Sequence, residues 1–159
     1  PNLRPPLWKS REEAREQILW GLSRADVVKI SDDEVEFLWG ITDETEAAGK
    51  LLNEYGVRLA MITLGPKGAY LANRNGGARA VCPPVKPIDT TGAGDIFGGS
   101  AVARLLKTGK EPDCLTVEEL AAIAAFASTA ASLSTQVTGG IPSIPSEEAV
   151  LMHLCTGNA

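Results

Sequence analysis

The chain has 159 residues, 44% of them hydrophobic, and a formal net charge of −5. This length and composition suffice for one domain with a hydrophobic core. The absence of a basic tract excludes the usual surface of a nucleic-acid-binding protein, and no apolar run approaches the roughly 20 residues that cross a bilayer. Cys82, Cys114 and Cys155 are widely spaced and show no zinc or disulfide pattern. We therefore expect reduced thiols and a cytoplasmic protein.

Helix-capping patterns and apolar runs alternate along the first part of the chain. Ser10 and Ser31 are each followed three residues later by a glutamate, the spacing of a capping box that opens a helix. The apolar runs between the helices are typical of buried strands. The expected elements are helices at 10–24, 31–40 and 43–55 and strands at 25–30 and 58–64.

Glycine-rich turns separate short apolar segments in the middle of the chain. The turns at 65–68 and 75–77 predict strands at 69–72 and 78–82, added antiparallel at one end of the sheet. Prolines exclude a helix between residues 82 and 87. Further helices are expected from the next glycine turn to about Lys107, from Thr116 to about Ser134, and after Ser146. This order predicts an α/β layered domain with a mostly parallel sheet.

The string Asp-Thr-Thr-Gly-Ala-Gly-Asp at residues 89–95 has the clearest chemical meaning. It predicts a tight turn that leaves backbone N–H groups unpaired at a helix N-terminus, an arrangement that suits an anion. Asp95 beside such a cradle could deprotonate a hydroxyl that attacks a phosphoryl group, which points to a kinase. The alternative is that Asp95 only complements the helix dipole. Phe97 stands where a dinucleotide fingerprint needs glycine, and the chain has no Walker A loop.

Segments along the whole chain resemble the carboxyl-terminal half of ribokinase-like sugar kinases, the phosphofructokinase B family, with fructokinases as the most similar group. Residues 89–100 resemble the second signature of that family. The other similar segments are 1–8, 28–38, 63–69 and 139–145. The resemblance implies an incomplete ribokinase-like three-layer α/β/α sandwich, in which residues 1–159 form the ATP-binding and catalytic-base portion without a second domain. Because the chain begins at Pro1, in a proline-rich loop and without methionine, we expect it to be part of a longer protein.

The resemblance also implies roles for individual residues. Asp95 would be the catalytic base and contact the sugar, with Gly92, Ala93 and Gly94 as the anion hole. ATP would be held by Thr63, Gly65, Pro66, Lys67 and Gly68, with Ser128 near the adenine and Lys29 near the phosphates. Four assignments have structural alternatives. The ATP turn could be a plain strand-turn-strand with a solvated lysine, Ser128 a helix-face hydroxyl and Lys29 the end of a strand. Arg4, implied to contact sugar or phosphate, could be an ion-pair partner.

Two cation sites follow from the same resemblance. Glu34 would help to organise Mg²⁺ indirectly, as the acid of the family's Asn-x-x-Glu motif. Ser31 replaces the asparagine here, so the pair is equally an ordinary capping box. A monovalent cation, K⁺, would bind between two loops. Its implied ligands are Asp89, Thr91 and groups at Ser134, Val137, Gly139 and Ser143.

The implied activity is ATP-dependent phosphorylation of a sugar hydroxyl, with fructose converted to fructose 6-phosphate as the first choice. The alternatives are a 2-keto-3-deoxygluconate kinase and a non-catalytic nucleotide-binding fragment. The sugar-selecting residues and the lid belong to the amino-terminal half of the family, so we expect the fragment alone to be inactive. The expected partners are sugar and ATP, without nucleic acid or membrane, and the full-length protein would form a homodimer through that lid.

Overall fold

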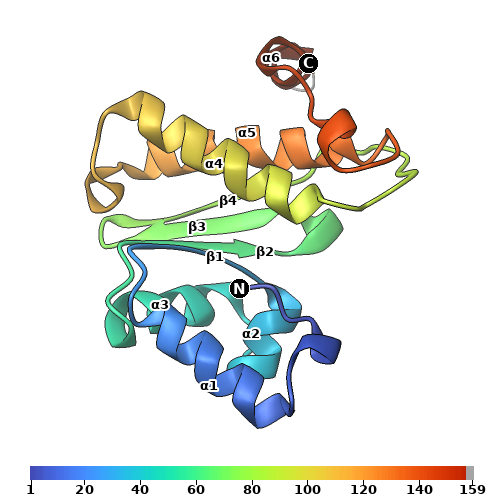
Figure 1. The fold of residues 1–159 in the computed structure, drawn as a ribbon. Coiled ribbons are helices and arrows are strands. Elements are labelled where there is room, and N and C mark those ends of the chain that lie inside the picture. The colour runs from blue at the N-terminus through green and yellow to red at the C-terminus, as the bar shows by residue number, and fades with distance from the viewer. Residues whose placement is uncertain (157–159) are drawn as a thin grey trace.

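A four-stranded sheet in the order β1-β2-β3-β4 forms the middle layer of the protein, and the computed structural model describes residues 1–156 (Figure 1). The strands are β1 (Val27–Ser31), β2 (Leu59–Thr63), β3 (Ala69–Asn73) and β4 (Gly76–Ala80). The helices are α1 (Arg11–Leu22), α2 (Asp32–Trp39), α3 (Glu44–Glu54), α4 (Ala93–Thr108), α5 (Val117–Ser134) and α6 (Glu147–Thr156). Single 3₁₀ turns lie at η1 (Pro5–Leu7), η2 (Gly65–Lys67), η3 (Pro112–Cys114) and η4 (Ile141–Ser143).

The sheet is mixed. β1 and β2 are parallel, with Val27 opposite Leu59 and Ser31 opposite Thr63, whereas β2–β3 and β3–β4 are antiparallel. The predicted antiparallel additions are therefore confirmed. The expectation of a mostly parallel sheet holds only for the β1–β2 pair.

The last strand lies two residues earlier than the sequence predicted, at Gly76–Ala80. The glycines that read as a turn belong to the strand itself, because Gly77 pairs with Ala72 and lies under the ring of Tyr70. A Cβ at Gly77 would come within 2.0 Å of the Tyr70 hydroxyl oxygen. A residue with a side chain here would require the Tyr70 ring to move.

Helix starts follow local capping chemistry. Ser31 and Thr116 both form complete capping boxes with the glutamate three residues on, and Ser10 accepts the Glu13 N–H. Ser146 accepts the Ala149 N–H at the start of α6. These contacts supply acceptors for N–H groups that the first helical turn leaves unpaired, and they confirm the predicted helix starts.

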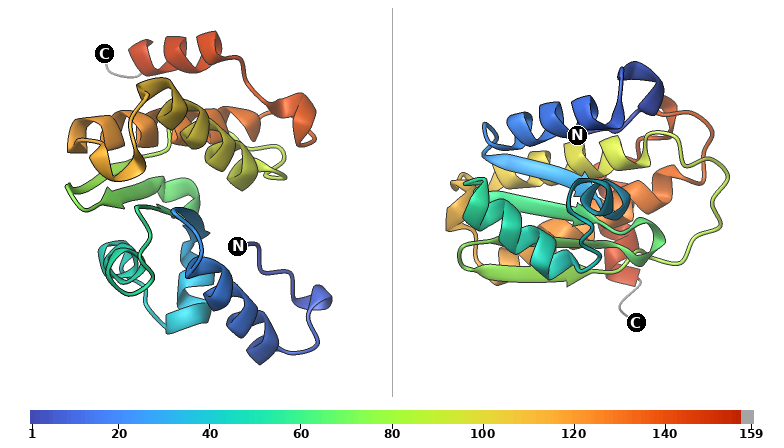
Figure 2. Two further views of the ribbon diagram at one scale, coloured as in Figure 1. Left: turned by 60° about the vertical axis from the view of Figure 1, so that its left-hand side comes forward. Right: turned by 90° about the horizontal axis from the view of Figure 1, so that it is seen from below.

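Two hydrophobic clusters hold the three layers together, one on each face of the sheet. Alternate residues of β2 point to opposite faces: Ala60 and Ile62 pack with α1–α3, and Leu59 and Met61 pack with α4 and α5. Figure 2 shows the two helical layers on either side of the sheet. The buried run at 59–62 is thus a strand covered on both faces, as predicted.

Helix α5 is long and apolar enough to cross a membrane by length and composition alone. About half of it, 56%, is buried, including Leu120, Ile123 and Ala127 in the core. The core helix of a globular domain meets the same criteria, and its contacts here are with β4, β3, α4 and α6.

Candidate active site

A left-handed glycine starts α4 next to a second glycine-rich loop. Gly92 is the N-cap residue, with φ of 78°, a conformation that disfavours residues with a Cβ. A Cβ at this position would lie 3.3 Å from the Cα of Gly140. Gly92 therefore allows both the turn and the close approach of the loop at 139–145. Gly140 was not among the predicted site residues, although its segment carried part of the family resemblance.

Several backbone N–H groups at the N-terminus of α4 have no hydrogen-bond acceptor among the described residues. No side chain caps it. The Ala93 N–H donates to the Thr90 carbonyl at 3.2 Å, and the Ile96 N–H donates to the Gly92 carbonyl at 2.9 Å. Within residues 1–156, no acceptor is recorded for the N–H groups of Gly92, Gly94 and Asp95. Of the three residues predicted as the anion hole, Ala93 alone has its N–H engaged in a turn.

Lys29 reaches this helix end from β1. Its Nζ lies 3.2 Å from the point that a Cβ on Gly94 would occupy. Among the described residues no carboxylate pairs with this ammonium group. A cation at the positive end of a helix dipole is unfavourable in isolation. The helix end and Lys29 together thus form a positive site that a bound anion would neutralise.

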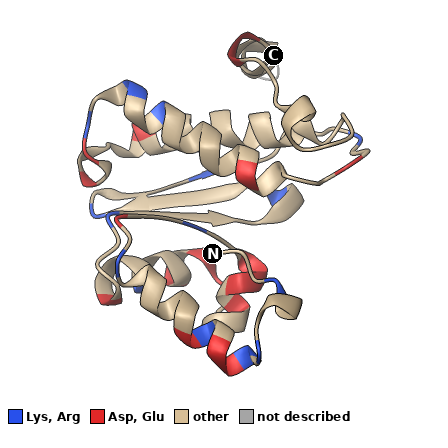
Figure 3. Ribbon diagram, in the orientation of Figure 1, with Lys and Arg blue, Asp and Glu red and all other residues tan. Residues whose placement is uncertain are grey.

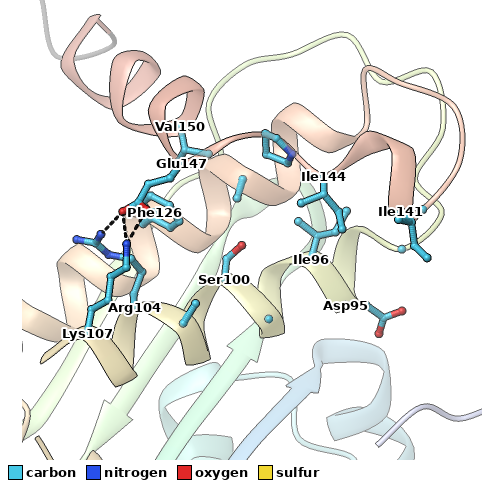
Figure 4. Close-up of a pocket in the computed structure, with 16 residues that line it drawn as sticks. Asp95, Ile96, Ser100, Arg104, Lys107, Phe126, Ile141, Ile144, Glu147 and Val150 are labelled. Atoms are coloured by element: carbon cyan, nitrogen blue, oxygen red, sulfur yellow. Dashed lines mark hydrogen bonds and ion pairs between the residues drawn. The ribbon is translucent and has the colours of Figure 1, made fainter. Parts of the chain in front are cut away.

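Asp95 lies in the first turn of the same helix and is exposed. Figure 4 shows its carboxylate at one end of a groove, pointing out from the helix. Its side chain makes no hydrogen bond or ion pair within the part of the chain that the structure describes. An exposed, unengaged carboxylate beside an anion site can accept a proton, and it also complements the helix dipole.

The groove has a volume of about 490 Å³ and runs along α4 from Gly92 to Lys107. At its far end Glu147 accepts hydrogen bonds from Arg104 at 3.0 Å and from Lys107 at 2.6 and 2.5 Å (Figure 4). Lys107, and to a lesser degree Arg104, lower the pKa of Glu147. This ion-pair cluster fastens α6 to α4. The charges at that end are therefore already compensated.

The predicted nucleotide turn follows β2, at the same end of the sheet where β1 finishes. Thr63 lies opposite Ser31, and its hydroxyl donates to the Ile30 carbonyl at 3.4 Å. Gly65, Pro66 and Lys67 form η2, with the Lys67 side chain exposed. Gly68 has φ of 104°, and a Cβ there would lie 1.9 Å from the Ala80 carbonyl oxygen. This turn is therefore fixed against β4, near the carboxyl ends of the parallel pair.

Two further residues, Ser128 and Arg4, were predicted to contact ligands. Ser128 is 1% exposed inside α5, and its hydroxyl has no hydrogen-bond partner. A nucleotide could not reach it in this conformation. Arg4 is exposed, and no ion pair is recorded for it within residues 1–156. The ion-pair alternative for Arg4 is thus not seen.

Glu34 is 8% exposed, and both of its carboxylate oxygens accept hydrogen bonds from the protein. Oε2 accepts from the N–H and hydroxyl of Ser31 at 3.0 and 3.1 Å, and Oε1 accepts from the Leu3 N–H at 3.0 Å. The capping-box alternative is therefore confirmed. The tie to Leu3 was not predicted, because residues 31 positions apart give no local signal. A magnesium role for Glu34 stays a prediction.

Asp89 joins the two loops that the resemblance assigns to a monovalent cation. Its carboxylate accepts the N–H of Thr91 and that of Gly139, each at 2.9 Å. These bonds, first the one from Gly139 and then those from Thr91, lower the pKa of Asp89. The Ile88 and Asp89 N–H groups also donate to the Thr135 carbonyl.

The other predicted cation ligands lie on the same pair of loops. The hydroxyls of Ser134 and Ser143 donate to the Ala131 and Gly140 carbonyls, and Val137 is half-exposed. No group of three or more His, Cys, Asp or Glu residues is placed to hold a metal within residues 1–156. Potassium coordination by these loops stays a prediction.

Charge on the rest of the described surface is mixed. Figure 3 shows many acidic residues over the layer formed by α1, α2 and α3, with lysines and arginines scattered over both helical layers. The positive site at Lys29 is thus a local feature of a chain whose net charge is −5.

Comparisons with known proteins give the relatives of this chain. The chain is 40% identical to fructokinase-1 of Zea mays over 152 residues, covering 95% of this chain and 46% of the relative. It is 36% identical to probable fructokinase-2 of Arabidopsis thaliana, with 97% and 46% covered. The chain thus spans about half the length of the curated relatives that it matches.

Solved structures show the same half-length match. The fructokinase of Vibrio cholerae O395, a double mutant solved with fructose, ADP and potassium ion, superposes with a TM-score of 0.79 at 30% identity, covering 96% of this chain and 48% of that one. The aminoimidazole riboside kinase of Salmonella enterica, complexed with its riboside and an ATP analogue, gives 0.78 at 28% identity, with 96% and 50% covered. The family model of pfkB family carbohydrate kinases matches residues 1–147, and the chain therefore belongs to that family.

Proposed function

We propose that this chain is the nucleotide-binding and base-carrying part of an ATP-dependent sugar kinase, with fructose as the acceptor. The observation that carries the proposal is the ammonium group of Lys29, without an ion pair among residues 1–156, beside the N–H groups at the start of α4 that have no acceptor within the same residues. Positive groups of this kind hold phosphoryl oxygens and stabilise the charge that develops on them. The fructokinases among the relatives support fructose as the acceptor.

In the proposed reaction, Asp95 accepts the proton of a sugar hydroxyl. The oxygen attacks the γ-phosphorus of ATP while the bond from that phosphorus to the bridging oxygen of ADP breaks, so that sugar phosphate and ADP form. Gly92 and Gly94 N–H groups and Lys29 face the moving phosphoryl group. Positioning and electrostatics of this kind are most of what phosphoryl transfer needs from a protein.

The nucleotide is proposed to lie along the turn formed by Thr63, Gly65, Pro66, Lys67 and Gly68, at the carboxyl edge of the parallel pair. Ligands in α/β sheets bind at this edge. Mg²⁺ commonly keeps several waters and is held largely by substrate phosphates. This fits a chain in which both oxygens of Glu34 are already engaged by protein donors. Mg²⁺ would then arrive with ATP and offset its negative charge.

Nucleotide binding can be tested on the 159-residue chain itself. Calorimetric titration with ATP and Mg²⁺ should give binding that Lys29→Met weakens about tenfold or more, since a charged contact to phosphate is lost. Lys110→Met removes a lysine that pairs with Glu119 and serves as the matched control. Unchanged ATP affinity in Lys29→Met would contradict the phosphate site.

Turnover is tested in a longer polypeptide that carries this segment, with fructose and 2-keto-3-deoxygluconate as separate substrates. Asp95→Asn should lower kcat by about 10²–10⁴-fold, the usual contribution of a general base, while ATP affinity is retained. Equal turnover in both forms would exclude Asp95 as the base. Nucleotide binding without turnover in either form would favour a non-catalytic nucleotide-binding module.

A further inference from the structure

Helix α6 lies on the outer side of the helical layer formed by α4 and α5 (Figure 1). Its buried residue Val150 is 1% exposed and joins an apolar cluster with Ile96 of α4 and with Phe126 and Ala130 of α5. This cluster is separate from the two that cover the sheet. Ile96 directly follows Asp95 at the start of α4. The cluster therefore connects α6 with the turn that carries the candidate base.

A second attachment of α6 lies at the far end of the groove along α4. Glu147, the first residue of α6, binds Arg104 and Lys107 (Figure 4). The guanidinium carbon of Arg104 also lies 4.9 Å from the centre of the Phe126 ring, which adds a cation–π contact to α5. Cations near the end of α4 and an anion at the start of α6 each suit the dipole of their own helix. These contacts fix the start of α6 beside the second half of α4.

Residues 140–146 connect the candidate anion site with this ion-pair cluster. At one end Gly140 lies close to Gly92, since a Cβ on Gly92 would come within 3.3 Å of the Gly140 Cα. The segment then forms the single turn η4, in which the hydroxyl and the N–H of Ser143 donate to the Gly140 carbonyl at 2.7 and 3.2 Å. At the other end Glu147 is fixed to α4. The segment thus runs along α4 between two fixed points.

The part of the segment between these points is weakly held. Ile141 is 85% exposed and Ile144 57% exposed, although both line the groove between α4 and α6 (Figure 4). The groove, of about 490 Å³, keeps α4 and α6 from packing directly along its length. Because apolar side chains that remain exposed add little to stability, the position of Gly140 depends on how the ends of the segment are fixed.

We propose that α6 positions the start of α4, with Glu147 and Val150 as the positioning residues. Val150 holds Ile96 through their shared apolar cluster, and Glu147 fixes the segment whose other end lies against Gly92. Both attachments act on the turn from Gly92 to Asp95. The proposal rests on the proposed function, since the geometry that α6 maintains is that of the phosphate site.

Amide hydrogen exchange in the 159-residue chain measures this positioning without reference to activity. The Gly139 N–H donates to Asp89, and the Ile96 N–H donates to the Gly92 carbonyl. The exchange rates of these two reporter N–H groups show how often the loop and the start of α4 open. The N–H groups of α3, on the other face of the sheet, serve as the internal reference.

The two positioning residues should differ in the size of their effect. Val150→Ala should speed exchange at the reporter N–H groups about tenfold and Glu147→Gln about threefold, because a buried apolar contact contributes more than a partly exposed ion pair. Exchange in α3 should stay unchanged in both variants, since α6 does not pack on that layer.

Two further variants are matched controls on the other face of the sheet. Val57→Ala makes the same substitution at a residue that is 4% exposed in the cluster with α1–α3. Glu54→Gln breaks the ion pair between Lys50 and Glu54 on α3. Neither should change exchange at the reporter N–H groups, because neither residue contributes to the attachment of α6.

Turnover in a longer polypeptide that carries this segment separates positioning from simple stabilisation. At a temperature where circular dichroism shows every variant folded, Val150→Ala should lower kcat about tenfold and change KM for ATP less than about twofold, because the start of α4 faces the phosphoryl group as it moves. Val150→Ile keeps the apolar contact, with room in the adjoining groove, and should retain kcat. Val57→Ala should also retain it.

The proposal is overturned if neither α6 variant changes exchange at the reporter N–H groups, if the controls act equally, or if Val150→Ala turns over at the full rate. No turnover in the unmodified polypeptide would contradict the proposed function instead. The exchange rates would then still decide whether α6 positions the start of α4.

Discussion

Single residues decide the chemistry of the candidate site. Lys29 and Asp95 are far apart in the sequence, yet one brings its ammonium group to Gly94 and the other follows Gly94 directly. Within residues 1–156, Asp95 has no hydrogen-bond or ion-pair partner and Lys29 forms no ion pair, so neither charge stabilises the fold through such a contact. Asp89 is the opposite case, because both of its oxygens hold backbone N–H groups. The same residue type thus leaves an unengaged carboxylate at one end of the turn and fixes loop geometry at the other.

The role of Asp89 predicts a specific pH dependence of stability. Its pKa is lowered by the Gly139 and Thr91 hydrogen bonds, so its contribution is fully present above the ordinary aspartate value of about 3.9. It is lost as the pH falls through the lowered folded-state pKa. Denaturant titrations should therefore show Asp89→Asn less stable than the unmodified chain at pH 6, with the gap closing below pH about 4. A gap that persists unchanged at lower pH would show that the charge is not responsible.

At the scale of elements, the sequence predicted what local chemistry controls. The capping serines and threonine mark where α1, α2, α5 and α6 begin, because cap and N–H lie within three residues of each other. β4 was misplaced, since Gly77 is explained by Tyr70 of a neighbouring strand and Gly76 by its positive φ and the nearby Val117. The burial of Ser128 and the contact of Lys29 with the start of α4 also depend on packing between distant elements. No periodicity in the chain encodes such contacts.

The capping box of α2 allows its structural and metal roles to be separated. Ser31→Ala should cost about 1 kcal/mol of folding stability, the usual value of an N-cap. Glu34→Ala should cost more, because it also releases the Leu3 N–H. If Glu34 acts only in the fold, any change in ATP affinity should be the same with and without Mg²⁺. This should hold for each of the two variants. A loss confined to the Mg²⁺ measurement of Glu34→Ala would assign the metal role instead.

At the scale of the whole molecule, the candidate site lies at the end of the sheet where the parallel strands β1 and β2 finish. The glycine turn after β2, Lys29 of β1 and the start of α4 meet where the parallel strands end (Figure 1). Asp95 lies on α4, the helix that also carries the exposed Val102 and Leu106. The proposed nucleotide site consists of residues of this chain.

Nucleotide binding should therefore stabilise the isolated chain, although its net charge of −5 gives no general attraction for an anion. A ligand at 100 times its Kd adds about 2.7 kcal/mol to the stability of the folded state. For a domain of this size that raises Tm by about 5–10 °C. At the same ATP concentration, a variant that binds tenfold more weakly should gain about half as much.

Thermal scans of the 159-residue chain with and without ATP measure this difference directly. Lys29→Met should show the halved shift, because its ammonium group is the uncompensated charge at the start of α4. Lys110→Met should show the full shift, since its lysine pairs with Glu119 on the surface. Equal shifts in the two variants would mean that ATP binds elsewhere. A shift in neither, nor in the unmodified chain, would mean that the 159-residue chain alone does not bind ATP.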